Sequence, residues 1–258
     1  MLELSNLGWP QTPYGSTGQI IQRPRRLLTG LTTLWADDHG PVLMSAAAVF
    51  IPVHRTRPVP VVHGPFNFGY RVLAATTTKE TPEILAALDV LLVQARRDAH
   101  AIAWHNAEDD LYSMSILNPD QQGVAGVTAA WTARNRTPRA KGIARCVDTA
   151  QDLGPAELLA DTAAANGLNL GRLFPVQDQD NVQSAFEELT ENGDDPYIRD
   201  VVAQNCAGGA LTQALTVALL GGKHLGHLEW EEPPQVSKEL ELIAWDRLPV
   251  LFPTVSEA

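Results

Sequence analysis

The sequence predicts an α/β protein in which helices cover both faces of a mixed five-stranded sheet. Three observations favour this class. Apolar, strand-like runs come early in the chain, helical patterns separate the later strands, and a long helical pattern follows the last strand. The chain has 258 residues, of which 45% are hydrophobic, so its length and composition suit one large domain.

A hairpin is predicted to open the sheet. Residues 27–35 form a mixed apolar and threonine run, and residues 42–51 form a strongly apolar one. The polar cluster at 37–40, Asp-Asp-His-Gly, is typical of a turn. A third strand is predicted at 67–75, so the first three strands should form an antiparallel meander.

The next helix is predicted at 82–98, with Thr81 as its cap and Pro82 at the first helical position. A helical crossover returns the chain in the same direction, so the strand after it should run parallel to its neighbour. We therefore expect the strands that end at His105 and Asp148 to join the first strand in parallel.

The remaining elements are predicted by the same patterns. They are a short helix at 109–116, strands at 124–134 and 142–148, and helices beginning at Pro155, at 182–191 and at 196–220. Gly167 is predicted to end the first of those three helices, and Gly221–Gly222 the last. The polar and basic residues 135–141 would then form a hairpin tip between the two strands.

The chain is predicted to have three parts: an irregular arm at 1–24, a domain at 25–230 and a tail at 231–258 packed on that domain. The longest apolar run, 41–53, is shorter than the about 20 residues of a membrane span. The first residues lack the pattern of a signal peptide, and the two cysteines form no CxxC pair. We expect a cytoplasmic protein with no membrane partner.

Three segments together resemble the DEDD-type 3′–5′ exonucleases, the RNase T-like and proofreading enzymes with a ribonuclease H-like fold. Residues 101–112 are similar to the family's strand that runs into His-Asn-x-x-Phe-Asp, with Asp110 on its metal-binding aspartate. Residues 144–149 are similar to its strand that ends in Asp-Thr, and residues 210–215 to its last helical motif. The resemblance covers roughly residues 25–222.

The resemblance implies a site with four carboxylates, which hold two Mg²⁺ or Mn²⁺ ions about 4 Å apart. The matching positions here are Gly30, Thr32, Asp110 and Gln213, and Gly208 replaces the general-base histidine. One carboxylate cannot offset the repulsion between two divalent cations. The sequence therefore predicts an exonuclease-like protein without catalysis or a bound metal, acting as a nucleic-acid-binding or partner-binding subunit.

Two alternatives stay open. The first is an active exonuclease that uses Mg²⁺ or Mn²⁺, in which Asp37 or Asp38 joins Asp110 as a ligand. The second is a scaffold with no nucleic-acid role, which the net charge of −11 favours because phosphate contacts need basic side chains. Asp110 itself could be a residual metal ligand or an acid that stabilises the beginning of a helix.

The densest basic cluster is predicted to touch phosphates if the protein binds single-stranded nucleic acid. The cluster also includes Arg145, and the residues predicted to supply the phosphate contacts are Arg134, Arg136, Arg139 and Lys141. The alternative is a solvated hairpin tip. The sequence leaves open whether the ligand is DNA, RNA or protein, and it does not give the oligomeric state.

Overall fold

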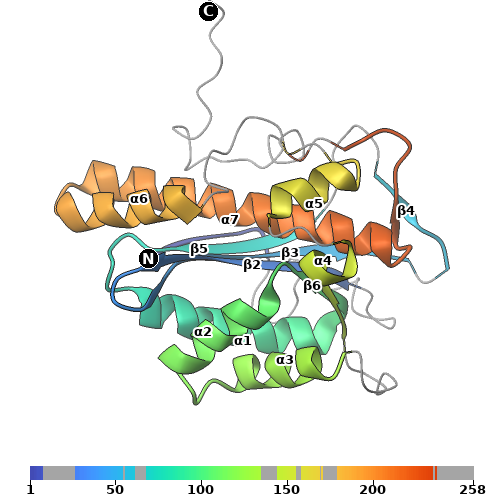
Figure 1. Cartoon of the computed structure of the whole chain (residues 1–258), viewed down its shortest axis with the longest axis horizontal. Helices are drawn as coiled ribbons and strands as arrows, with labels where there is room; N and C mark the ends of the chain where they lie inside the picture. The colour runs from blue at the N-terminus through green and yellow to red at the C-terminus, as the bar shows by residue number, and fades with distance from the viewer. Residues whose placement is uncertain are drawn as a thin grey trace, which may run out of the picture.

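The computed structural model describes residues 1–7, 27–54, 56–61, 68–134, 144–154, 158–168, 170, 179–234 and 236. Among these residues, six strands form one mixed sheet that lies between two layers of helices (Figure 1). Its strands are β1 (Leu2–Ser5), β2 (Leu27–Asp37), β3 (Pro41–Pro52), β5 (Gly69–Ala74), β6 (Ala99–Trp104) and β7 (Arg145–Asp148). They lie in the order β1-β5-β3-β2-β6-β7.

The predicted meander and its parallel extension are confirmed. Strand β3 pairs antiparallel with β2 on one side and with β5 on the other. Strand β6 pairs parallel with β2, with Gly30 opposite Ala103, and β7 pairs parallel with β6, with Asp148 opposite Trp104. This arrangement brings the polar residues that follow β6 and β7 to the same edge of the sheet.

Strand β1 corrects two predictions: residues 2–5 of the predicted irregular arm at 1–24 form a strand, and the sheet has six strands and not five. Residues 2–5 alternate apolar and polar, and they pair antiparallel with β5. Leu2 and Leu4 pack against a core cluster, while Glu3 accepts a hydrogen bond from Arg71 Nε at 3.0 Å. A strand this short is easily missed, because the glycine- and proline-rich residues after it dominate the local composition.

Helices cover both faces of the sheet (Figure 1). One layer contains α1 (Thr81–Asp98), α2 (Ala107–Leu117) and α3 (Gln122–Thr132). The other contains α5 (Leu159–Ala165), α6 (Gln179–Glu191) and α7 (Pro196–His224), and the single turn α4 (Thr149–Asp152) follows β7. Each layer has its own buried apolar cluster against the sheet. Separately, β4 (Val59–Pro60) and β8 (Leu228–Glu229) pair in parallel.

The strand predicted at 124–134 is wrong, because this segment belongs to helix α3. Its buried side chains, Val124, Val127 and Trp131, recur three and four residues apart, which is the spacing of a helix face. No hairpin therefore joins this segment to β7. The predicted hairpin tip, with Arg136, Arg139 and Lys141, lies outside the described residues.

The last helix is longer than predicted, since α7 continues through Gly221 and Gly222 to His224. These glycines permit close packing and do not end the helix. A Cβ atom at position 221 would lie 2.6 Å from the Cβ of Ala103, and one at position 222 would lie 2.6 Å from a methyl group of Leu28. A glycine pair in the sequence predicts the end of a helix, whereas here the pair lets α7 lie close to the sheet.

Candidate functional site

Helix α7 crosses strand β2 at the positions where the resemblance places the metal ligands. The Thr32 hydroxyl donates a hydrogen bond to Gln213 Oε1 at 2.8 Å, so these two residues, 181 positions apart in sequence, are in direct contact. Both side chains are neutral, and Thr32 is buried while Gln213 is partly buried. The contact thus joins helix to strand without any charge that could balance a cation.

Gly30, the one glycine of β2, lies where α7 packs closely against the strand. A Cβ atom there would lie 2.1 Å from the carbonyl oxygen of Ala214 and 2.7 Å from the Cβ of Ala218. Distances under 3 Å force the backbone to move, so no larger residue fits without displacing the helix. The space for an aspartate side chain at position 30 is filled by the backbone of α7.

Gly208 lies within α7, one turn before Thr212, and is buried. Its carbonyl oxygen accepts a hydrogen bond from the Thr212 hydroxyl at 2.8 Å. Glycine has no side chain that could accept a proton, so this position offers no general base.

Asp110 is held by two tryptophans. Trp104 Nε1 donates to one carboxylate oxygen at 2.6 Å, and Trp35 Nε1 donates to the other at 2.9 Å. The Trp35 indole also donates to Thr33 Oγ1 at 2.9 Å. Both tryptophans belong to the cluster under α1, α2 and α3, so Asp110 lies on the opposite face of the sheet from the Thr32–Gln213 contact.

The surroundings of Asp110 favour its protonated form. Burial raises the pKa of this carboxyl to about 7, and the neighbouring carboxylate of Asp109 adds to the rise. Hydrogen bonds from Thr33, Trp104 and Trp35 act in the other direction and stabilise the charged form. The net result is a carboxyl group that changes charge near neutral pH, unlike an exposed aspartate.

Asp37 and Asp38 lie in the exposed turn between β2 and β3. The Asp37 carboxylate accepts from the backbone N–H of Gly40 at 3.0 Å, and the backbone N–H of Asp37 donates to Gln183 Oε1 at 2.9 Å. Asp37 therefore closes the hairpin turn and contacts α6. Across the described residues, no three His, Cys, Asp or Glu side chains are grouped so that they could hold a metal ion.

Arg134 is a buried structural cation. One guanidinium nitrogen donates to Glu108 Oε1 at 3.1 Å, another donates to Gln151, and the group lies 5.6 Å from the centre of the Trp131 ring. Its side chain is only 7% exposed. Arg134 thus ties the end of α3 to α2 and α4, and the predicted phosphate contact would have to break these bonds.

The His-Asn and Asp-Thr segments meet at the ends of β6 and β7. His105 Nδ1 is hydrogen-bonded to Thr149 Oγ1 at 2.9 Å, and Thr149 donates to the carbonyl of Trp104 at 3.3 Å. The wholly buried Asp148 accepts from the backbone N–H groups of Asn106 at 3.3 Å and Ala150 at 3.1 Å. These bonds fix the loops that follow β6 and β7 at this edge of the sheet.

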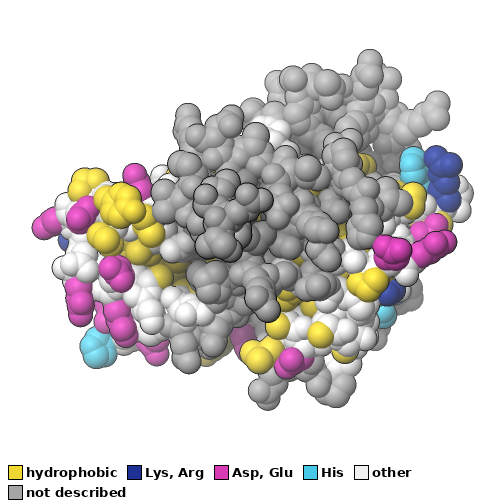
Figure 2. All heavy atoms as spheres, turned by 90° about the horizontal axis from the view of Figure 1, so that it is seen from above, with side chains coloured by type: hydrophobic (Ala, Val, Ile, Leu, Met, Phe, Trp, Pro, Cys, Tyr) yellow, Lys and Arg dark blue, Asp and Glu magenta, His cyan; other side chains and the backbone are white. Residues whose placement is uncertain are grey.

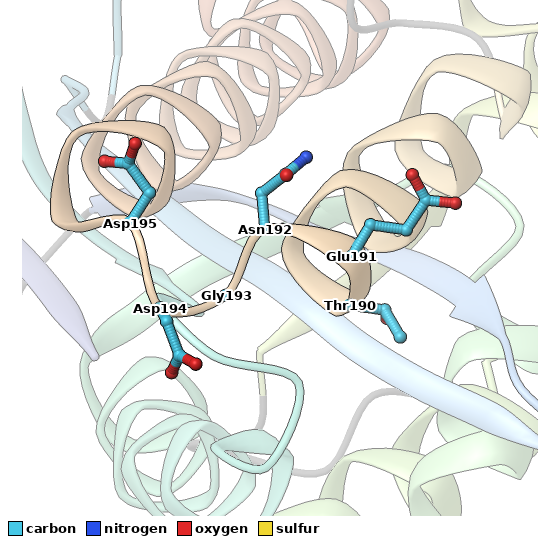
Figure 3. Close-up of a pocket in the computed structure, with 6 residues that line it drawn as sticks. All are labelled: Thr190, Glu191, Asn192, Gly193, Asp194 and Asp195. Carbon is cyan, nitrogen blue, oxygen red and sulfur yellow. The ribbon is translucent and has the colours of Figure 1, made fainter.

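A further hollow lies in the loop between α6 and α7. Its lining residues, drawn in Figure 3, are Thr190, Glu191, Asn192, Gly193, Asp194 and Asp195. The three carboxylates point away from one another (Figure 3). That of Asp195 accepts from the backbone N–H of Tyr197 at 2.8 Å and thereby caps α7. This hollow therefore lies at the capped beginning of α7, and its carboxylates do not converge as the ligands of a metal ion would.

The sequence comparisons add no relative: no family model matches the chain, and no curated protein is similar to it. Of the helices in the described part of the chain, none is long and apolar enough to cross a membrane.

Proposed function

We propose that this chain has a ribonuclease H-like fold and is a non-catalytic relative of the DEDD exonucleases that serves as a partner-binding subunit. The strand order supports the fold. A meander of β2, β3 and β5, continued by the parallel strands β6 and β7 after the crossover helix α1, is the arrangement that the resemblance predicts. Helix α7 lies over β2, where the family's last motif should lie.

The observation that carries the loss of catalysis is the hydrogen bond between Thr32 and Gln213. Two divalent cations carry four positive charges, which the family balances with carboxylates. Here a neutral hydroxyl and a neutral amide satisfy each other, and Gly30 supplies no ligand because α7 occupies its side-chain space. Neutral oxygens can hold one metal ion weakly, but they do not offset the repulsion of a second.

The carboxylate of Asp110 does not supply a metal ligand to the Thr32–Gln213 contact. Asp110 faces the other layer of helices, where two indole N–H groups occupy both of its oxygens. The turn acids Asp37 and Asp38 are exposed and are not grouped with it. The active alternative would require Asp37 or Asp38, which lie in the exposed turn between β2 and β3, to share a metal ion with the buried Asp110 of α2.

The charge of the chain favours a protein partner over nucleic acid. The net charge of −11 repels phosphates, and Arg134, one of the four basic residues predicted to bind them, is already paired with Glu108. A subunit that has lost its metals can still stabilise a complex through its surface. We infer that recognition of a partner protein is the role of the fold in this chain.

An exonuclease assay tests this proposal. We expect no release of nucleotides from single-stranded DNA or RNA in the presence of Mg²⁺ or Mn²⁺. The matched control is Asp110→Ala, with its folding checked by circular dichroism. Release by the wild-type protein that disappears in the variant would contradict the proposal and favour the active alternative. Equal release by both proteins would identify a contaminating nuclease.

A further inference from the structure

A second surface lies at the end of α7, away from the Thr32–Gln213 contact. Here β4 and β8 form a short parallel pair, fixed by hydrogen bonds from the Val59 N–H to the His227 carbonyl and from the Val61 N–H to the Glu229 carbonyl, both 2.8 Å long. These bonds pair the backbone of β4, which contains Pro60, with that of β8, which Trp230 follows directly. Figure 2 shows acidic side chains gathered at both ends of the face that carries α7.

A hollow of about 640 Å³ opens beside this strand pair. Two kinds of residue make up its described lining: apolar walls and an acidic rim. The walls are Pro60, Val61, Trp230 and Pro234, and the rim is Glu229, Glu231 and Glu232. None of these lining residues is basic. The hollow therefore combines apolar contact area with three negative charges.

A basic side chain of the same chain, Lys223, already contacts the tryptophan of this hollow. Lys223 Nζ lies 4.3 Å from the centre of the Trp230 ring and donates to the carbonyl of Asn166 at 3.1 Å. Within the described residues, Glu229 and Glu231 form no ion pair with Lys223 or with another basic side chain. Two glutamates of the rim thus remain available to a cation that comes from outside the chain.

This combination fits an arginine side chain. Arginine has an apolar stem that can lie along proline and tryptophan, and a planar guanidinium that can donate two parallel hydrogen bonds to a carboxylate. Its weak hydration makes it the basic residue most suited to a partly enclosed site. A phosphate or another anion would be repelled by the same rim.

We propose that this hollow binds an arginine in an extended segment of a partner protein. The inference deepens the partner-binding role proposed above and rests on it. The charge complementarity between the rim and a guanidinium selects the occupant, and the prolines and Trp230 supply the contact area that holds its stem. The test below uses binding alone, so it is distinct from the nuclease assay that tests the loss of catalysis.

The experiment measures the binding of a fluorescein-labelled peptide by fluorescence anisotropy. The peptide carries arginines among glycine, serine and proline, and its matched partner carries citrulline, which keeps the shape and removes the charge. The intact protein is compared with Glu229→Gln/Glu231→Gln and with a control, Glu187→Gln/Asp194→Asn, which removes the same charge from α6 and the loop after it.

The wild-type protein should bind the arginine peptide about tenfold more tightly than the citrulline peptide. The rim variant should lose about tenfold in affinity for the arginine peptide, and the control should keep it within about twofold. Equal losses in both variants would overturn the proposal, because the attraction would then be a property of the whole acidic surface. Equal affinity for both peptides, or no binding up to roughly 1 mM, would overturn it as well.

Discussion

The two faces of strand β2 carry different chemistry. On the α7 face, Gly30 and Thr32 are small and neutral, and Thr32 bonds to the neutral Gln213. On the opposite face, Asp110 keeps its carboxyl group between the indoles of Trp35 and Trp104. The Asp110 carboxyl is therefore explained by the two indole donors that it satisfies. The α7 face holds a tightly packed, neutral contact instead.

The largest effect should come from filling the space at Gly30. We expect Gly30→Ala to lower the free energy of unfolding by about 3 kcal/mol, because its Cβ would overlap the backbone of α7. Urea unfolding at constant pH measures the change. A loss below about 1 kcal/mol would mean that α7 moves away easily, and the α7 face would then have room for a larger site.

Removing the Asp110 carboxyl tests the face of β2 that lies opposite to α7. We expect Asp110→Ala to cost about 2 kcal/mol, because the Trp104 N–H loses its acceptor while Trp35 keeps the Thr33 hydroxyl. Asp110→Asn retains one acceptor oxygen and should cost about half as much. Urea unfolding of both variants checks the order. Equal stability of wild type and Asp110→Ala would contradict a structural role for this carboxyl.

The pH dependence of stability follows from the same group. The pKa of Asp110 is about 7 in the folded protein, against an ordinary value of 3.8. The folded state therefore holds this proton more tightly, and unfolding releases it between about pH 4 and pH 7. The contribution of Asp110 is full at low pH, and it is lost as the pH rises through this window.

Unfolding of wild type and Asp110→Asn at several pH values isolates this contribution. The stability of the wild type relative to the variant should fall as the pH rises from about 4 to 7, and it should level off above that. In the folded protein, the indole N–H signals of Trp35 and Trp104 should shift around pH 7, where Asp110 changes charge. Parallel stability profiles for the two proteins would show that Asp110 titrates normally.

The smallest effect is expected for the basic residues. Arg134→Ala should reduce stability, because it breaks the pair with the Glu108 carboxylate. The triple replacement of Arg136, Arg139 and Lys141 tests the remaining basic residues of the predicted cluster. If single strands bind at all, this triple variant should flatten the salt dependence of binding, and an unchanged slope would exclude these residues as phosphate contacts.

The sequence predicted the sheet well because its signals are local. Apolar runs mark β2 and β3, and the helical pattern at 82–98 implies the parallel return to β6. Helix α3 was missed because its valine, threonine and tryptophan residues are also typical of a strand. The short strand β1 was missed because it becomes stable only when it pairs with β5.

The candidate site was only half predictable. The residue types at Gly30, Thr32, Asp110 and Gln213 can be read from the sequence, but which of these residues are in contact cannot. The Thr32–Gln213 bond joins residues 181 positions apart, and the Trp35–Asp110 bond joins residues 75 apart. Which face of β2 each one uses depends on strand register and on the close approach of α7, and neither has a local signal.

Titration calorimetry with Mn²⁺ tests most directly the claim that the α7 face holds no metal pair. We expect no heat of binding for the wild-type protein, and one weak site for Thr32→Glu/Gln213→Asp, because this variant places two carboxylates at the contact. The variant should not gain a second site, since Gly30 still lacks room for a ligand. Two Mn²⁺ ions bound to the wild-type protein, lost in Asp110→Ala, would contradict the account.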